Sequence, residues 1–201
     1  MAFTRDDVDL IECNTAWQGY YRMDVYRLRY RLFKGGWSGE IRREVFERGI
    51  AAAVVPYDPV RDEVVLIRQF RPGAFAAGMT PWLWEIVAGI IEPGETPLEV
   101  VTREAQEEAA LSISQPIQIC KYLVSPGATS ETCTLFCAKV DASKAGGVHG
   151  LAAENEDIEV NVVPFARIEQ MLKDDVLNNA KTIIGLQWLV LNRDRLRRDW
   201  R

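Results

Sequence analysis

Residues 85–111 constrain the fold of this chain more than any other stretch. An apolar segment ends at Pro93-Gly94, and a new pattern starts at Thr96. Thr96 is a favourable N-cap, Pro97 suits the first helical position, and Glu99 completes a capping box. No Gly or Pro then interrupts the chain as far as Leu111. The sequence therefore predicts a strand, a tight turn and a helix that ends near Leu111.

The predicted helix separates apolar side chains from carboxylates. At about 100° per residue, one face is apolar and is expected to pack on the core: Leu98, Val101, Ala105 and Ala109. The residues away from that face are Arg103, Glu104, Glu107 and Glu108. Like charges at this spacing cost about 0.2–0.5 kcal/mol per pair, and Arg103 offsets only part of that. A hard divalent cation such as Mg²⁺, which prefers oxygen ligands, would explain the cluster. The alternative is a solvated acidic face.

The spacing of this stretch resembles the Nudix box. Gly89 is followed after five residues by Glu95, after seven more by residues 103–108, and after one more by Ala110-Leu111. The resemblance implies metal-dependent hydrolysis of a pyrophosphate bond. One position departs, because the family usually has Gly where this chain has Ala110. If the backbone there has a positive φ, Ala costs on the order of 1 kcal/mol, and we expect a reshaped helix end without loss of a ligand.

Length and composition are those of a globular protein. The chain has 201 residues, of which 48% are hydrophobic and 26% charged, enough for one substantial core and a small subdomain. The net charge of −5 argues against a general nucleic-acid or anionic-membrane binder. No apolar run approaches the roughly 20 residues that span a bilayer, and the N-terminus lacks the apolar segment of a secretory signal. We therefore expect a cytoplasmic protein with neither nucleic acid nor membrane as a partner.

The four cysteines, Cys13, Cys120, Cys133 and Cys137, are expected to be reduced thiols. A zinc site is disfavoured because His149 is the only histidine and no Cys-x-x-Cys pair exists. His149 lies in a Gly-rich segment, where we expect a surface role.

The rest of the chain alternates between strand-like and helix-like segments. Strands are expected at 8–13, 20–32, 40–48, 50–56, 63–70, 82–91, 117–124, 132–140 and 158–165, and helices at 166–173 and 179–194. Residues 72–81 should form a mobile loop. The longer connection 141–157 ends in an acidic cluster, which favours a functional loop.

This order predicts an α/β (α+β) fold with helices packed on a mixed sheet. The resemblance sharpens it to the Nudix α/β/α sandwich over residues 49–201, preceded by a small antiparallel sheet over residues 1–48. Exposed edges and several aromatic residues make that sheet a candidate dimerisation element. The alternative is that the aromatic side chains pack within the same subunit.

Outside the box, the chain resembles the bacterial ADP-ribose pyrophosphatases over essentially its whole length. The matching stretches are 42–49, 58–67, 125–131, 149–151 and 154–158, and Pro126 is the family's usual mark of ADP-ribose preference. The resemblance implies hydrolysis of ADP-ribose to AMP and ribose 5-phosphate. One alternative is a pyrophosphatase for another nucleotide sugar, such as ADP-glucose or GDP-mannose. Another is a Nudix ligand sensor without turnover, which is disfavoured because Glu104, Glu107 and Glu108 are all present.

By the same resemblance, residue roles carry over by position. The implied metal ligands are the carbonyl oxygen of Ala88 with Glu104, Glu107, Glu108 and Glu156, which would hold two or three Mg²⁺, with Mn²⁺ as an alternative. Arg103 would orient Glu107. Glu154 would be the catalytic base, with Glu156 as the second choice.

The resemblance also implies a set of substrate contacts and a homodimer with shared active sites. The contacts would be Tyr20, Tyr21, Arg43, Glu44, Arg48, Arg71, Ile90, Ser125, Pro126, Gly127 and Glu131. Arg side chains suit phosphates, and Glu131 suits ribose hydroxyls. Tyr20 and Tyr21 would stack on the adenine from the partner subunit.

Overall fold

A computed structural model describes residues 2–200, which divide into two compact units. The first unit comprises the chain up to Gly49 together with Leu123–Thr132. The second comprises Ile50–Tyr122 and the chain from Cys133 onwards. Within residues 2–200, no helix is both long enough and apolar enough to cross a membrane.

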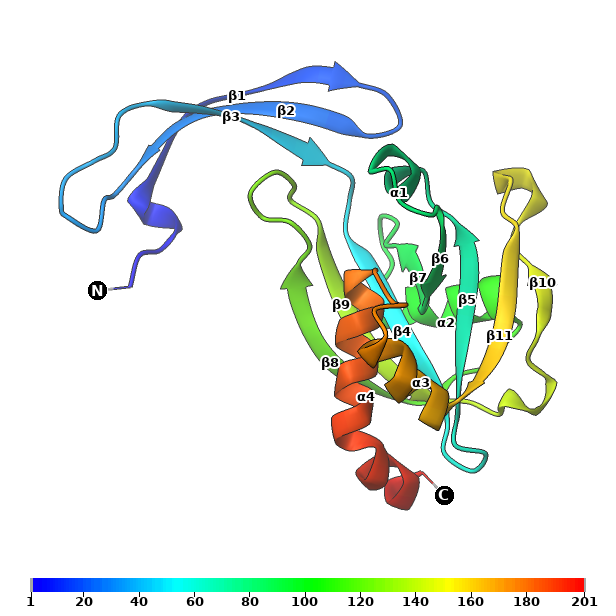
Figure 1. Ribbon diagram of the computed structural model, residues 1–201. Coiled ribbons are helices and arrows are strands. Elements are labelled where there is room, and N and C mark those ends of the chain that lie inside the picture. The colour runs from blue at the N-terminus through cyan, green and yellow to red at the C-terminus, as the bar shows by residue number, and fades with distance from the viewer. Residues whose placement is uncertain (1, 201) are drawn as a thin grey trace. The chain divides into compact units, whose positions relative to one another are not determined.

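The first unit is built on a three-stranded antiparallel sheet in the order β1-β2-β3 (Figure 1). A short 3-10 turn, η1 (Arg5–Asp7), leads into β1 (Val8–Gln18), followed by β2 (Arg22–Tyr30) and β3 (Ile41–Glu47). The β1–β2 register shifts at two places, Leu10/Glu12 and Thr15/Trp17. Opposite charges face each other across the strands, with Arg27 bonded to Glu12 at 2.7 Å. Apart from Asp9, every side chain of β1 is exposed.

The segment 123–132 belongs to this unit because it bonds to β3 and to the residues that follow it. The N–H of Phe46 donates to the carbonyl of Ala128 at 2.8 Å. Ser130 donates to the carboxylate of Glu47. Segments far apart in sequence are thereby joined at the end of the small sheet.

The second unit contains an eight-stranded mixed sheet. The path runs β10-β11-β5-β4-β9-β8, with β6 paired to β5 and β7 paired to β4. Strands β4 and β9 are parallel, whereas β4–β5, β5–β11 and β10–β11 are antiparallel. The strands are β4 (Ala51–Asp58), β5 (Glu63–Phe70), β6 (Trp82–Glu85), β7 (Val87–Ile90), β8 (Ser114–Leu123), β9 (Thr132–Lys139), β10 (Gly147–His149) and β11 (Ile158–Pro164).

Helices cover both faces of this sheet, as Figure 1 shows. Helices α3 (Phe165–Lys173) and α4 (Ala180–Asp199) lie on one face, and α2 (Pro97–Ala109) lies on the other. Along β4, Val55 and Tyr57 join the core under α3 and α4, while Val54 joins the core under α2. Since both faces are buried, β4 reads as a continuous apolar run. The predicted mixed α+β sandwich, preceded in the chain by a small antiparallel sheet, is confirmed.

The chain between Phe70 and Ile91 differs in detail from its prediction. The expected loop 72–81 contains a short helix, α1 (Pro72–Ala76). The expected single strand 82–91 is wrong, because it divides into β6, which pairs with β5, and β7, which pairs with β4. At the break, the N–H of Ile86 donates to Thr182 Oγ1 in α4 at 3.2 Å. The break between β6 and β7 thus coincides with a hydrogen bond to α4, 96 residues away in the sequence.

The connection 141–157 also contains short elements of its own. Residues Ala142–Lys144 form the 3-10 turn η2, and Ala152–Glu154 form η3. Between them, β10 pairs with β11 through the partners Gly147 with Val160 and His149 with Ile158. The loop is therefore attached to the sheet edge rather than free along its length.

Helix α2 has the expected start and a buried face that is rotated from the expected one. Both halves of the capping box between Thr96 and Glu99 form. The buried residues are Val100, Val101, Ala105, Glu108 and Ala109, whereas Leu98 is 42% exposed. The expectations that Leu98 packs on the core and that Glu108 lies away from it are wrong. The first turn leaves Leu98 at the surface, and the buried arc extends to Glu108.

Helix α2 ends at a strained residue. Ala110 adopts the left-handed conformation, with φ 50° and ψ 35°. In that conformation its N–H reaches the carbonyl of Gln106 at 3.0 Å, and the N–H of Leu111 reaches that of Ala105 at 2.9 Å. The left-handed region costs a non-glycine residue about 1–2 kcal/mol. Ala110 therefore has the positive φ that the sequence analysis considered for this position.

Replacing Ala110 by Gly is expected to raise the free energy of unfolding by about 1 kcal/mol, because Gly adopts this conformation without strain. Urea denaturation of both proteins measures the change. Ala77→Gly is the matched control, since Ala77 follows α1 with φ −80° and gains no relief from Gly. An Ala110→Gly protein no more stable than the parent would show that Ala110 stores no strain.

Candidate active site

The acidic face of α2 lies directly against β7 because Gly89 has no side chain. A Cβ atom added at Gly89 would lie 1.8 Å from Glu104 Oε1 and 2.3 Å from Glu104 Cδ. Non-bonded heavy atoms do not approach this closely, so any side chain at position 89 would displace the Glu104 carboxyl group. The glycine therefore fixes where this carboxyl group lies.

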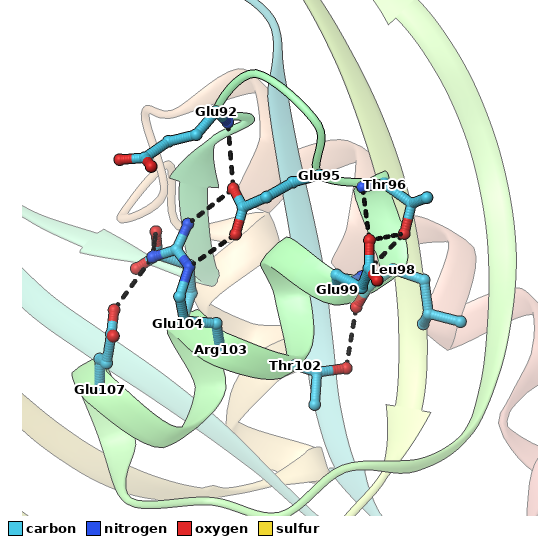
Figure 2. A network of polar contacts seen from close by, with 9 residues as sticks. All are labelled: Glu92, Glu95, Thr96, Leu98, Glu99, Thr102, Arg103, Glu104 and Glu107. Atoms are coloured by element: carbon cyan, nitrogen blue, oxygen red, sulfur yellow. Dashed lines mark hydrogen bonds and ion pairs between the residues drawn. The ribbon is translucent and has the colours of Figure 1, made fainter.

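Arg103 holds the outer carboxylates of the helix together, as Figure 2 shows. Its Nη1 donates to Glu104 Oε1 at 2.9 Å and to Glu107 Oε2 at 3.0 Å. Its Nε donates to Glu95 Oε1 at 3.0 Å, and Glu95 Oε2 accepts the N–H of Glu92 at 3.0 Å. One guanidinium thus links the turn before α2 to two carboxylates on α2.

Glu108 is buried on the inner side of the same helix, with 3% of its surface exposed. Its Oε2 accepts the N–H of Ala88 in β7 at 3.1 Å, and Gln69 Nε2 lies 3.4 Å from its Oε1. Burial raises the pKa of Glu108 to about 8, and the negative charges of Glu104 and Glu156 act in the same direction. Burial also raises the pKa of Glu104. The positive charge around Glu104 and Glu108 is too small to offset the burial of two ionised carboxylates.

A second buried carboxylate, Glu85, has no role among the sequence predictions. It is the last residue of β6 and is 0% exposed. Arg71 Nη2 lies 2.6 Å and Lys181 Nζ 3.2 Å from its carboxylate, which also accepts a hydrogen bond from Asn179. The signal that could have found it is an acidic residue inside an otherwise apolar strand, since Glu is almost never fully buried unless it is paired.

The acidic end of the 141–157 connection is partly described. Glu156 Oε2 accepts the N–H of Leu151 at 3.1 Å, and the N–H of Glu156 donates to the carbonyl of Leu151 at 3.3 Å. Asn155 between η3 and Glu156 is left-handed, with φ 55°. The side chain of Glu154 lies outside the described part of the chain, so its role as base stays a prediction.

The first unit brings several of the predicted substrate contacts together. Arg48 pairs with the buried carboxylate of Glu131 at 3.3 Å, and its guanidinium lies 5.6 Å from the ring centre of Tyr21. Tyr20 is 86% exposed and meets Tyr21 edge to face at 4.8 Å. The remaining predicted contacts in this unit are all exposed: Arg43, Glu44, Ser125, Pro126 and Gly127. Arg71 and Ile90 belong to the second unit.

Residues 47–185 match the family model described as NUDIX domain. The chain belongs to the Nudix family. It is 47% identical over 200 residues to the ADP-ribose pyrophosphatase of Escherichia coli strain K12, covering 100% of this chain and 96% of that protein. It is 38% identical to the Haemophilus influenzae ADP-ribose pyrophosphatase, covering 99% and 93%. A GDP-mannose pyrophosphatase of Cronobacter sakazakii is 36% identical over 162 residues, covering 77% of this chain and 82% of that protein.

The fold has a counterpart among solved structures. A crystal structure of an ADP compounds hydrolase superposes with a TM-score of 0.71, covering 98% of each chain at 20% sequence identity. At that identity the likeness concerns the fold, and it agrees with the Nudix architecture of the second unit.

The carboxyl groups of this Nudix site have the chemistry of a divalent-cation site. Glu104 and Glu108 supply hard oxygen ligands, and the charges on Glu104, Glu108 and Glu156 act on one another. Among residues with described side chains, no three acidic, histidine or cysteine side chains already converge as a complete metal site. Arg103 engages Glu104 and Glu107, and the backbone of Leu151 engages Glu156. A bound cation would compete with these bonds, and the donor set fits Mg²⁺.

Replacing Gly89 by Ala is expected to weaken Mg²⁺ binding at least about tenfold while leaving the fold intact, because the added Cβ displaces the flexible end of Glu104. The Mg²⁺ dependence of Tm measures binding to the folded state. Gly39→Ala is the control, since a Cβ there meets nothing within 4 Å. Equal Mg²⁺-induced rises in Tm for Gly89→Ala and the parent would mean that Glu104 does not bind the cation.

Proposed function

We propose that this Nudix protein hydrolyses the diphosphate of ADP-ribose to AMP and ribose 5-phosphate with the help of Mg²⁺. The observation that carries the proposal is the pair of carboxyl groups, Glu104 and Glu108, held against the backbone of Gly89 and Ala88. Full-length relatives named ADP-ribose pyrophosphatases support the choice of substrate. In the reaction, the oxygen of one water forms a bond to phosphorus, and the bridging P–O bond breaks.

We assign the cation to the carbonyl oxygen of Ala88 with Glu104 and Glu108, and Glu107 and Glu156 would complete the ligand set. When bound, Mg²⁺ neutralises the diphosphate, lowers the pKa of a bound water and stabilises developing charge. Arg103 orients Glu107 and Glu104 through its two hydrogen bonds. The base that takes the proton from water is Glu154, or Glu156 as the second candidate. The number of cations, two or three, and their replacement by Mn²⁺ belong to the same proposal.

Arg71 is the residue of the second unit proposed to bind the diphosphate. Its planar guanidinium can form paired hydrogen bonds to phosphate oxygens. In the first unit, Tyr20 and Tyr21 would stack on adenine, with Arg48 and Glu131 as further substrate contacts. What supports this assignment is that Arg48 contacts both Tyr21 and Glu131 within that unit.

Hydrolysis of another nucleotide sugar is the alternative, and the relative named GDP-mannose pyrophosphatase favours it as the second candidate. Comparing kcat/KM for ADP-ribose, ADP-glucose and GDP-mannose separates the two. The highest kcat/KM for ADP-ribose supports the proposal, and a higher value for another sugar overturns the choice of substrate.

Replacing Glu108 by Gln is expected to lower kcat by about two orders of magnitude or more, because a neutral amide binds Mg²⁺ more weakly than a carboxylate and does not balance its charge. AMP release from ADP-ribose in Mg²⁺ measures the rate, and circular dichroism checks the fold. Glu92→Gln, an exposed acid in the turn before α2, is the matched control and should retain the parental rate. A Glu108→Gln protein with the parental rate would remove Glu108 from the cation site.

We also propose that the protein is a cytoplasmic homodimer with shared active sites that binds neither nucleic acid nor membrane. Large apolar side chains on and beside the small sheet are exposed in the single chain, among them Ile11, Trp17 and Phe33. A lone sheet with so many exposed apolar side chains is explained by a partner surface. The register shifts in β1 disfavour simple strand addition and favour contact through a face. Among the described residues, none of the four cysteines forms a disulfide, in keeping with a reducing compartment.

Light scattering after size exclusion is expected to give the mass of two chains, and the double variant Ile11→Lys, Trp17→Lys should give the mass of one, because two buried cations would oppose association. Val60→Lys is the control, since it places the same charge on an exposed apolar position of the second unit. A single-chain mass for the parent protein, or an unchanged dimer in the double variant, would contradict this interface.

A further inference from the structure

The Glu85 carboxylate divides its hydrogen bonds between two parts of the second unit. Its Oε1 accepts from Asn179 and from Lys181 Nζ at 3.2 Å, at the start of α4. Its Oε2 accepts from Arg71 Nε at 2.8 Å and Arg71 Nη2 at 2.6 Å, and from Gln69 Nε2 at 3.4 Å. One oxygen therefore anchors Glu85 to the helix, and the other faces residues beside the Nudix box.

The anchoring to α4 makes Glu85 a fixed group. Asn179 is the N-cap residue of α4, yet its side chain makes no capping hydrogen bond, because its amide is directed to Glu85. The residue after Glu85 is also bonded to this helix, because the N–H of Ile86 donates to Thr182 Oγ1 in the first turn of α4. With Oε1 held in this way, the carboxylate cannot follow a movement of Arg71.

Arg71 is held on one side only. Nε and Nη2 both donate to the same oxygen of Glu85, which fixes the plane of the guanidinium. Its Nη1 donates to no residue with a described side chain, and 37% of the Arg71 side chain is exposed. An arginine loses rotamer freedom when it binds an anion, and that loss is smaller when the side chain is already fixed.

Gln69 connects this pair to the predicted cation site. Its Nε2 lies 3.4 Å from Glu85 Oε2 and 3.4 Å from Glu108 Oε1. The buried amide therefore sits between the carboxylate that holds Arg71 and a carboxylate assigned to the cation. This chain of contacts links Arg71, the proposed phosphate contact, to Glu108, the proposed cation ligand.

We propose that Glu85 is a positioning residue, which holds the Arg71 guanidinium in a fixed orientation for the diphosphate of the substrate. The inference rests on the proposed function, because it takes Arg71 as a phosphate contact. Glu85 itself does not touch substrate, since its carboxylate is fully buried. Its effect passes through Arg71, whose Nε and Nη2 both donate to Glu85 Oε2.

The test compares variants on the two sides of the Glu85 carboxylate. Glu85→Gln places an amide among donors and loses the charged bond to Arg71, so we expect KM for ADP-ribose to rise about tenfold or more. The dissociation constant of ADP-ribose in EDTA, measured by calorimetry without turnover, should rise by a similar factor. Lys181→Met removes a donor only on the α4 side. It should lower Tm while KM stays within about twofold of the parent.

A double-mutant cycle with Arg71→Lys tests whether Glu85 acts through Arg71. The double variant Arg71→Lys, Glu85→Gln should be no more than about twofold worse than Arg71→Lys alone. Glu85→Asp, which keeps the negative charge between Arg71 and Lys181, serves if Glu85→Gln does not fold, and it should raise KM in the same way. A merely structural role would lower Tm in the Glu85 and Lys181 variants alike without separating their KM values.

The outcomes distinguish this inference from the proposed function. If the parent protein forms no AMP from ADP-ribose, the proposed function fails, and the inference fails with it. If the parent is active but the folded Glu85 variants keep the parental KM, or if the effects of the Arg71 and Glu85 variants simply add, the positioning role is overturned while the proposed function stands.

Discussion

The rest of this site depends on the close approach of α2 to β7. Gly89 leaves space for the Glu104 carboxyl group, and the N–H of Ala88 donates to Glu108 from the same strand. With any larger residue at position 89 the helix would stand farther from the sheet, or its carboxyl groups would point elsewhere. The absence of a side chain at Gly89 thus allows the carboxyl groups of Glu104 and Glu108 to lie against β7, where they could bind the cations of a diphosphate.

The charges around this contact are compensated at two levels. On the outer side, Arg103 binds Glu95, Glu104 and Glu107 at once (Figure 2). On the inner side, Glu85 is paired with two cationic side chains, so the pKa of this carboxyl stays below its ordinary value despite burial. Glu108 forms no ion pair with Arg103 or with the cations around Glu85, and burial raises its pKa, with the negative charges of Glu104 and Glu156 acting in the same direction. The unpaired acid is the one whose burial a divalent cation would make favourable.

Local patterns predicted much of this structure, and nonlocal contacts account for the rest. The capping box, the start of α2 and strand β5 follow from neighbouring residues and were predicted from the sequence. The division of 82–91 was not, because the partners of β6 and β7 and the Thr182 hydroxyl that marks the break come from distant segments. Likewise, helical periodicity wrongly predicted that Glu108 lies away from the core. Periodicity alone does not show which part of the helix surface the sheet covers.

In the candidate site, too, local patterns predicted some residues, and nonlocal contacts determine the environment of others. The spacing of the Nudix box predicted roles for Glu104, Glu107 and Glu108, and the structure bonds Arg103 to the first two of them. The environment of Glu85 was beyond sequence reasoning, because its partners lie near positions 70 and 180. Only the folded sheet brings the start of α4 beside β6.

A crystal structure of the protein with Mg²⁺ and a non-hydrolysable ADP-ribose analogue tests this cation site most directly. We expect a cation bound by Glu104, Glu108 and the carbonyl oxygen of Ala88, in contact with the diphosphate. A diphosphate and cation bound elsewhere, with Glu104 and Glu108 retaining only the contacts described here, would contradict it.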